Sequence, residues 1–162
     1  MRNLLLAVLC LLISACAAPH SFVLLDQTAV DQTTGLVWAK HANLPGKQLF
    51  WKGDGNVYEF IQKLNKDNYA GYADWRVPTK DELADLIGHA KSFGYDPANR
   101  ETWPFQKLRL QGFQDVRDYG YWSSTRKSPT ELWIADLAYG SVKPALDTKP
   151  YYLWPVRGGR NR

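Results

Sequence analysis

The amino-acid sequence predicts one α+β domain in which two helices pack on a twisted antiparallel sheet and long loops join the elements. Two helix-capping signals, each followed by apolar residues at one-face spacing, occur in the first half of the chain. Aromatic and β-branched runs separated by turns fill the last third. The chain has 162 residues without an internal repeat, which suits a single domain with its own core.

The first fifteen residues have the three-part layout of a secretory signal. Arg2 supplies a cation, an uninterrupted run of ten apolar residues extends from Leu4 to Ile13, and small residues precede Cys16. This run is about half as long as a membrane-spanning helix requires. We therefore expect residues 1–15 to direct export and then to be removed.

Cys16 is expected to carry lipid. Residues 13–16, Ile-Ser-Ala-Cys, resemble the bacterial lipobox, in which a cysteine is acylated and becomes the new N-terminus. Several acyl chains hold a protein at a membrane far more durably than one chain does. Because residue 17 is alanine and not aspartate, we expect a bacterial outer-membrane lipoprotein. The alternative is an ordinary signal peptide that is cleaved nearby, with a chance cysteine.

This processing leaves no thiol in the folded part of the protein. Cys10 leaves with the signal and Cys16 carries lipid, so neither a disulfide nor a cysteine metal site is expected. Stability must then come from packing. Seven tryptophans, nine tyrosines and six phenylalanines supply large side chains for it.

The folded domain is expected over residues 22–162, after a short tether at residues 16–21. A hairpin is predicted near its start, with strands at residues 22–25 and 36–38 around a polar turn at residues 31–35. The segment that follows, as far as Lys52, contains proline and glycine and is predicted to be a loop.

Two helices are predicted between residues 56 and 90. Asn56 stands at a helix-cap position with Glu59 three residues later, and Thr79 with Glu82 repeats the arrangement. Each cap precedes an apolar stripe that one face of a helix can bury. The stripes consist of Val57, Phe60, Ile61 and Leu64 in the first helix, and of Leu83, Leu86 and Ile87 in the second.

The rest of the chain is predicted to be an irregular region followed by strands. Residues 92–118 show no clear period, so we expect a long irregular segment closed by aromatic packing. The final strand is expected near a sheet edge because Pro155 cannot donate a hydrogen bond. Strands are predicted at residues 120–125, 131–137, 139–142 and 151–157.

Positive charge is concentrated in the C-terminal part of the chain. Residues 16–99 hold eight Lys/Arg against ten Asp/Glu, whereas residues 100–162 hold eleven against six. This asymmetry suits an acidic partner such as a sulfated or phosphorylated glycan. Export argues against nucleic acid as a partner. The alternative is a solvated basic surface that has no partner.

Loops beside the C-terminal strands supply candidate ligand-binding residues. If these loops converge at one end of the sheet, their cations form a basic site and their aromatic rings offer flat faces to sugars. The alternative is that the cations maintain solubility and the rings are core residues. The candidates are Arg126, Lys127, Lys143, Lys149, Arg157, Tyr139, Tyr151 and Trp154.

The sequence contains no recognisable catalytic or metal-binding motif. His20, His41 and His89 lie in no serine or cysteine nucleophile context, and we expect solvated side chains for them. Missing thiols and scattered histidines disfavour zinc, and the acidic loop typical of calcium sites is absent. We therefore expect a protein that is not an enzyme and that has neither a cofactor nor a bound metal.

Four sequence blocks occur together in an order typical of one known family. They are residues 31–38 (DQTTGLVW), residues 71–83 (GYADWRVPTKDEL), residues 121–125 (YWSST), and residues 133–140 continuing to residues 156–159. Together they resemble the Lcl C-terminal domain family, which is named for a bacterial collagen-like surface adhesin. The most specific block is DWRVPTKDEL, in which valine replaces the usual leucine.

The resemblance implies a C-type-lectin-like fold with two helices beside a twisted antiparallel sheet. Proteins of this family are typically secreted or attached to the surface, and the adhesin's domain is associated with sulfated glycosaminoglycan binding. We expect the motif residues to have structural roles in the first place. Trp75 and Pro78 would fix the entry to the second helix, while Asp74 and Arg76 would satisfy backbone groups or each other.

These inferences predict a cell-envelope lipoprotein whose lectin-like domain recognises an anionic glycan or another surface ligand in an adhesion-type role. One alternative is a structural accessory lipoprotein that docks on another envelope protein. A second alternative is a display protein with variable C-terminal loops. The expected partners are the membrane, a sulfated or otherwise anionic glycan and, for the accessory alternative, an envelope protein.

Overall fold

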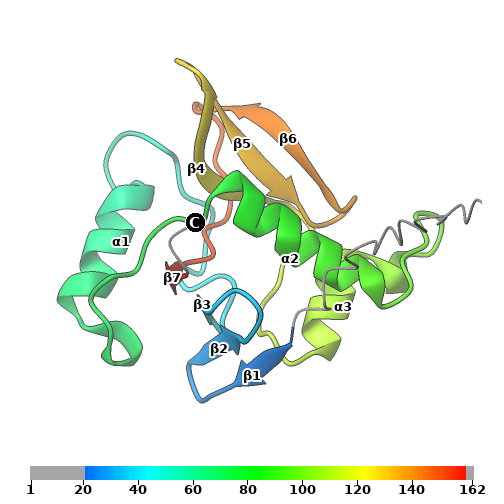
Figure 1. The fold of residues 1–162 in the computed structure, drawn as a ribbon. Helices are drawn as coiled ribbons and strands as arrows, with labels where there is room; N and C mark the ends of the chain where they lie inside the picture. Colours follow the sequence, from blue (N-terminus) through cyan, green and yellow to red (C-terminus); the bar gives the residue numbers. More distant parts are fainter. Residues whose placement is uncertain (1–20, 160–162) are drawn as a thin grey trace, which may run out of the picture.

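The computed structural model describes residues 21–159 and contains, within that range, three α-helices and two antiparallel sheets (Figure 1). The predicted α+β class is confirmed, although one helix and one sheet were not predicted. The predicted cleavage before Cys16 and the predicted lipid attachment lie outside the described residues. Of the predicted tether at residues 16–21, only Ser21 is described.

The first sheet joins the beginning of the domain to its end. Its strand order is β1-β2-β3-β7, and every neighbouring pair is antiparallel. The predicted hairpin exists but is formed by β2 and β3, because the strand after Phe22 pairs with β2 and not with residues 36–38. The strands are β1 (Phe22–Leu24), β2 (Thr28–Asp31), β3 (Leu36–Ala39) and β7 (Val156–Gly158).

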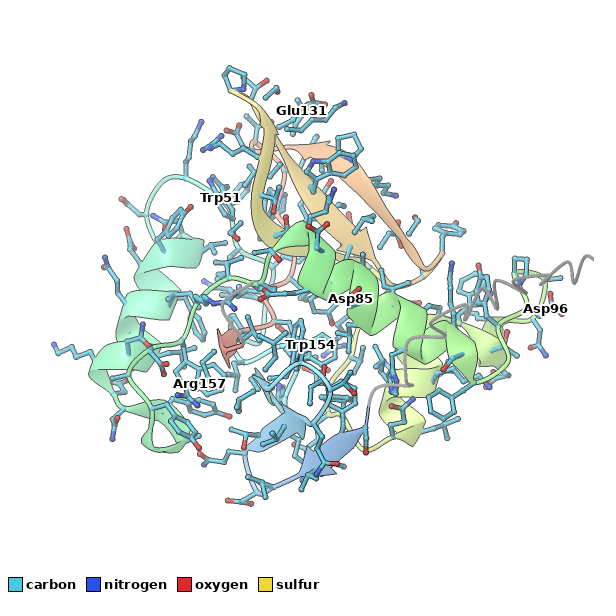
Figure 2. The ribbon with its side chains drawn as sticks, viewed as in Figure 1. Trp51, Asp85, Asp96, Glu131, Trp154 and Arg157 are labelled. Atoms are coloured by element: carbon cyan, nitrogen blue, oxygen red, sulfur yellow. The ribbon has the colours of Figure 1, made fainter. Side chains whose placement is uncertain are left out.

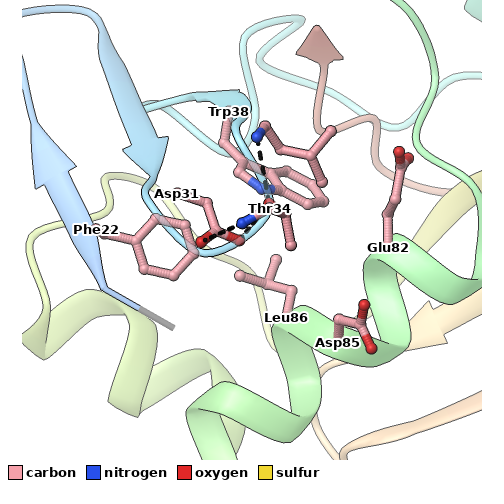
Figure 3. A pocket seen from close by; sticks show the side chains of 8 residues that line it. Phe22, Asp31, Thr34, Trp38, Glu82, Asp85 and Leu86 are labelled. Atoms are coloured by element: carbon pink, nitrogen blue, oxygen red, sulfur yellow. Dashed lines mark hydrogen bonds between the residues drawn. The ribbon is translucent and has the colours of Figure 1, made fainter. Parts of the chain in front are cut away.

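The turn between β2 and β3 is held by the buried carboxylate of Asp31. Its Oδ1 accepts the Thr33 backbone N–H at 2.8 Å, and its Oδ2 accepts the Thr34 hydroxyl at 2.6 Å. Figure 3 shows this turn facing Leu86 of the second helix. Gly35 completes the turn with a φ of 75°, a conformation that glycine adopts without strain.

The second sheet contains β4 (Gly120–Ser128), β5 (Glu131–Asp136) and β6 (Ser141–Leu146) in chain order. The first two predicted strands are present, but β4 extends to Ser128, so Arg126 and Lys127 lie in the strand and not in the turn after it. The third strand begins later than predicted because residues 137–140 form the turn that precedes it. The predicted strand at residues 151–157 is reduced to isolated bridges and the short β7.

The C-terminal segment ties the two sheets together. The Trp122 backbone N–H donates to the Tyr152 carbonyl at 2.9 Å, and the Tyr152 N–H donates to the Gly120 carbonyl at 3.0 Å. Tyr151 exchanges two further backbone hydrogen bonds with Leu49. The chain then enters β7 of the first sheet. The single sheet that the sequence predicted is therefore replaced by two sheets, which this segment connects.

The first two helices form where their caps predict. For α1 (Val57–Lys66), the Asn56 side chain accepts the backbone N–H groups of Tyr58 and Glu59. For α2 (Lys80–Ser92), Thr79 and Glu82 form a reciprocal capping box. Figure 1 shows α2 lying across the second sheet, with which its residues make contact.

A third helix lies inside the region predicted to be irregular. Pro104 begins α3 (Pro104–Leu110), and a short 3-10 helix (Arg100–Thr102) precedes it. Proline suits the first helical turn because its missing N–H would have no partner there. The helix has seven residues, too few for an apolar period to be recognised. No helix within residues 21–159 is long and apolar enough to cross a membrane.

Trp154 lies at the centre of the aromatic core. Its ring is fully buried and packs edge-on against Trp38 and Phe113, with centroids 5.7 and 5.1 Å away. Its indole N–H donates to the Ala39 carbonyl at 2.7 Å, so the buried donor is satisfied. Figure 2 shows Trp154 between α2 and the first sheet.

Arg76 links the cap of α2 to the end of β7. Its guanidinium donates to both carboxylate oxygens of Glu82, at 2.8 and 2.7 Å, and to the Gly158 carbonyl at 3.0 Å. Burial alone would raise the pKa of Glu82, but hydrogen bonds from Arg76 and the Thr79 N–H outweigh it and lower the pKa. Arg76 is therefore architectural, with Glu82 as its partner in place of Asp74.

Replacing the Glu82 carboxylate is expected to weaken the fold in a pH-dependent way. Glu82→Gln should lower the free energy of unfolding by about 1–2 kcal/mol at neutral pH, because an ionic hydrogen bond becomes a neutral one. A carboxyl with a lowered folded-state pKa contributes stability above its ordinary value of 4.5 and loses it as the pH falls through the folded-state pKa. The difference in the free energy of unfolding between Glu82→Gln and the wild type should therefore decrease as the pH falls.

Urea unfolding followed by tryptophan fluorescence at several pH values measures this difference. Asp81→Asn is the matched control, because Asp81 lies in the same helical turn with its side chain 85% exposed. A constant difference from pH 7 to pH 3, or an equal loss in the control, would contradict the assignment.

Candidate ligand-binding site

A hollow of about 440 Å³ opens on the second sheet where β5 ends and β6 begins. This volume lies within the range of small-molecule sites in proteins. Aromatic rings and charged groups share its walls. It is lined by Trp103, Asp118, Tyr119, Gly120, Ile134, Asp136, Ala138, Tyr139, Lys143 and Tyr151.

Asp136 shapes this hollow, which we call the sheet-end pocket. Its buried carboxylate accepts the backbone N–H groups of Ala138 and Tyr139 at 3.1 and 3.3 Å, which fixes the turn after β5. Its other oxygen lies 2.5 Å from Lys143 Nζ. This hydrogen bond raises the pKa of Lys143, so the ammonium group is held charged at the pocket wall.

Two aromatic pairs form walls of the pocket. Tyr119 and Tyr151 are stacked with centroids 5.8 Å apart, while Trp103 and Tyr139 lie 5.6 Å apart at 40°. Tyr139 is 64% exposed and Tyr119 is 47% exposed. Much of the surface of these two rings is therefore open to a ligand.

Gly120 allows Tyr151 to approach the sheet. A Cβ at this position would lie 2.5 Å from Tyr151 Cδ1 and 2.8 Å from Ile134 Cδ1, closer than carbon atoms can pack. A glycine is required because the tyrosine ring occupies the space of a side chain. The close approach places the Tyr151 ring at the pocket.

Cations and carboxylates balance one another in and around the pocket. Lys143 is paired with Asp136, and Arg100 is paired with Asp118. Burial, followed by the neighbouring Tyr119, raises the pKa of Tyr151, which keeps its hydroxyl protonated at neutral pH. The pocket therefore offers hydrogen-bond donors and acceptors beside flat apolar faces, without a large excess of either charge.

Three of the predicted site residues meet in this pocket, namely Lys143, Tyr139 and Tyr151. They come from β6, from the turn before it and from the C-terminal segment. The structure thus brings these three residues to one hollow, and their role in ligand binding stays a prediction.

Three other predicted cations lie toward the opposite end of the second sheet. Arg126 and Lys127 are exposed on β4 near its turn into β5, where Lys127 Nζ lies 4.0 Å from Glu131. Lys149 follows β6, whose last residue pairs with Glu131 at that same end. We call this region the hairpin end, and Figure 2 labels Glu131 within it. The predicted basic site is thus divided between two places.

Arg157 belongs to the architecture of the first sheet. Its guanidinium donates to both Asp74 carboxylate oxygens, at 2.6 and 3.1 Å, and lies 3.8 Å from the Tyr72 ring centroid. The hydrogen bond from Arg157 lowers the pKa of Asp74. Arg157 therefore lies in a different part of the fold from the sheet-end pocket.

The prediction that Trp154 offers a face to a ligand is wrong. Its side chain is completely buried in the core, so no ring face is accessible. Two buried neighbours, Leu153 and Val156, also show that this part of the segment lies inside the domain. Aromatic character alone does not distinguish a binding platform from a core residue.

Seven lining residues were not predicted, and four of them carry aromatic or charged side chains, namely Trp103, Asp118, Tyr119 and Asp136. The turn sequence Asp136-Leu-Ala-Tyr-Gly carried a usable signal, because aspartate before a glycine is typical of a turn that its own carboxylate caps. Trp103 lies within the segment predicted to be irregular, and Tyr119 directly follows it. Their positions depend on α3 and on packing that no local pattern encodes.

The structure also corrects the environment of His89. This residue is 5% exposed and not solvated, and its Nε2 lies 2.5 Å from Gln111 Oε1. His41 remains partly exposed, with Nδ1 accepting the Asn43 N–H at 3.3 Å. His20 lies outside the described residues. Residues 21–159 contain no group of three or more His, Asp or Glu side chains that could hold a metal ion.

Two other hollows lack the combination of aromatic and charged side chains that lines the sheet-end pocket. A mainly apolar one of about 320 Å³ lies between α1 and the start of α2, near Tyr58 and Val77. The crevice in Figure 3 brings Asp31 and Glu82 to its walls but has no space for a water molecule. The sheet-end pocket alone among these three combines several aromatic rings with paired charges.

Comparison with known protein families identifies a model that covers most of the chain. Residues 27–157 match the Lcl C-terminal domain, a range that includes the helices, most of both sheets and the whole sheet-end pocket. No curated protein matches the chain. Because the match covers most of the sequence, the chain belongs to the Lcl C-terminal domain family.

Proposed function

We propose that this protein is a non-enzymatic carbohydrate-binding protein of the bacterial cell envelope, anchored by lipid on Cys16. The sheet-end pocket is the observation that carries the proposal, and membership of a family of envelope-associated domains supports it. The domain is proposed to be C-type-lectin-like. Its role is adhesion to a glycan that bears acidic groups.

Sugar rings suit the chemistry of the pocket. Their apolar C–H faces can stack on Tyr139 and Tyr119, whose rings are exposed. Their hydroxyl groups can exchange hydrogen bonds with Lys143, Asp118 and the Tyr151 hydroxyl. Charged groups make the stronger of such bonds. A partly apolar and partly polar wall of this kind selects a ligand that has both kinds of surface.

The pocket carboxylates favour binding over hydrolysis. Asp136 already accepts two backbone N–H groups and the Lys143 ammonium, and Asp118 is paired with Arg100. A glycosidase needs one carboxyl that gives a proton and one that attacks or activates water. Both carboxylates here are committed to neighbouring groups, which supports a role in positioning.

The preference for an acidic glycan rests on the cations of the hairpin end. Arg126, Lys127 and Lys149 lie about 17 Å from the sheet-end pocket, the approximate length of β5. A linear glycan of several units has the length to contact both regions. Binding through exposed cations is screened by salt, whereas stacking in the pocket is not.

Removing one exposed ring should weaken glycan binding without disturbing the fold. Tyr139→Ala is expected to reduce affinity about tenfold, because a stacking contact is lost. The matched control is Phe50→Ala, since Phe50 is 49% exposed and does not line the pocket. A glycan array would select the ligand, and calorimetry would measure both variants. Equal affinity in the two variants, or no bound glycan on the array, would contradict the proposal.

Salt dependence separates the two regions. Replacing Arg126, Lys127 and Lys149 together by alanine should weaken heparin binding about tenfold at low salt and flatten its dependence on salt. Replacing Lys47, Lys63 and Lys66 changes the net charge equally on exposed positions elsewhere and serves as the control. Heparin-column retention over a salt gradient gives the comparison. If the control variant loses as much retention as the variant at positions 126, 127 and 149, the loss would reflect only the net charge, and the proposed role of the hairpin end would be contradicted.

The anchor is tested through the two cysteines of the full chain. Cys16→Ser should abolish lipid attachment and shift the protein out of the membrane fraction, whereas Cys10→Ser should leave both unchanged. Mass spectrometry of the N-terminal peptide measures acylation directly. An unmodified cysteine, or a mature terminus at another residue, would refute lipid anchoring.

A further inference from the structure

We propose that the end of the domain formed by β1 and the end of α3 rests on the lipid bilayer. The occupant of this surface is the membrane to which Cys16 is attached, so the inference rests on the lipid anchor proposed above. It goes further by assigning an orientation to the domain and a binding role to a surface other than the sheet-end pocket.

Apolar side chains are exposed where the described chain begins. Val23, Leu24 and Leu25 follow one another directly and are each at least 36% exposed, and Leu110 is 80% exposed at the end of α3. With Phe93, which is 50% exposed, they form what we call the apolar end. Surface aliphatic residues are ordinary when scattered, but a cluster indicates an interaction site.

Contacts with neighbouring residues place Leu24 and Phe93 at the same end of the domain. The Leu24 side chain lies against Gly112, two residues beyond Leu110, so closely that a Cβ there would overlap it. Phe93 packs on His89 with centroids 5.1 Å apart, and His89 packs on Phe22 at 5.0 Å. Figure 1 shows β1 beside the end of α3. The apolar end thus surrounds the first residues of the domain.

Chain length restricts which surface can meet the membrane. From Cys16 to Ser21 an extended chain spans at most about 18 Å. A folded domain of about 140 residues has a radius of gyration near 14 Å, which corresponds to a sphere about 37 Å across. The half of the surface opposite Ser21 therefore cannot reach the bilayer. The apolar end lies in the half that can.

Cations near the apolar end suit the headgroups of acidic lipids. Lys40 Nζ donates to the Leu25 carbonyl at 3.0 Å, and Lys107 lies in the last turn of α3, three residues before Leu110. Apolar side chains with adjacent lysine and arginine are typical of surfaces that enter the interfacial region of a bilayer. A lipid surface satisfies both parts of this arrangement.

This orientation directs the hairpin end away from the membrane. Glu131 lies at the opposite side of the molecule from β1 (Figures 1 and 2). Arg126 and Lys127 are then presented to the surrounding medium, where a glycan partner can reach them. The proposed anchor and the proposed ligand would not compete for one surface.

Depth-dependent quenching tests the orientation. The mature domain has no other thiol, so Gln27→Cys beside the apolar end and Pro129→Cys at the hairpin end can each carry a fluorescent dye. The lipidated full chain is inserted into vesicles of phosphatidylcholine and phosphatidylglycerol that contain nitroxide-labelled lipid. The dye at position 27 should be quenched about threefold more than the dye at position 129.

A second pair of substitutions locates the contact. In the Gln27→Cys protein, Leu110→Glu should remove most of the difference in quenching, whereas Leu146→Glu should preserve it. Leu146 is the matched control because it is also exposed, at 49%, and lies at the hairpin end. Circular dichroism verifies that both variants are folded.

Vesicle flotation separates the two possible failures. A protein that does not float with vesicles lacks the anchor. This result would overturn both the proposed lipid anchor on Cys16 and the proposed membrane contact of the apolar end. A protein that floats but shows equal quenching at positions 27 and 129 keeps the anchor and overturns the membrane contact. The latter result is also expected if the apolar end covers another protein, since the vesicles contain none.

Discussion

Residues 151–158 run between the two sheets and form backbone hydrogen bonds with both, and this connection holds the domain together. Tyr152 bonds to β4, Tyr151 bonds to Leu49, and Val156 bonds to Arg76 before the chain pairs with β3. Trp154 fills the space between these bonds. The described domain contains no thiol, so its two sheets are held together by this segment and by packing, without a disulfide.

The same connection makes the sheet-end pocket depend on distant parts of the chain. Tyr151 belongs to the C-terminal segment, Trp103 precedes α3, and Lys143 and Asp136 come from the second sheet. These residues meet only after the last segment has inserted between the sheets. Contacts between residues far apart in sequence carry a high entropic cost before they stabilise anything. The pocket is therefore among the features that require a fully assembled domain.

Local signals in the sequence were sufficient for some elements but not for others. Asn56 and Thr79 predicted α1 and α2 because a cap acts on its own first turn. The short β2 and α3 were missed because they contain only four and seven residues, too few for either to show a full apolar period. Trp154 and Tyr151 have similar sequence contexts, yet one is a core residue and the other lines the pocket. That difference arises from tertiary packing alone.

The turn after β5 has a consequence for how specificity can change in evolution. Asp136 holds this turn through the backbone N–H groups of Ala138 and Tyr139, and backbone groups are the same whatever side chain is present. The side chains at positions 138 and 139 can therefore be exchanged while the turn keeps its shape. If the sheet-end pocket binds the proposed glycan, selection can alter the ligand through these two positions and leave the stability of the domain largely intact. Proteins with the same frame would then diverge in what they bind.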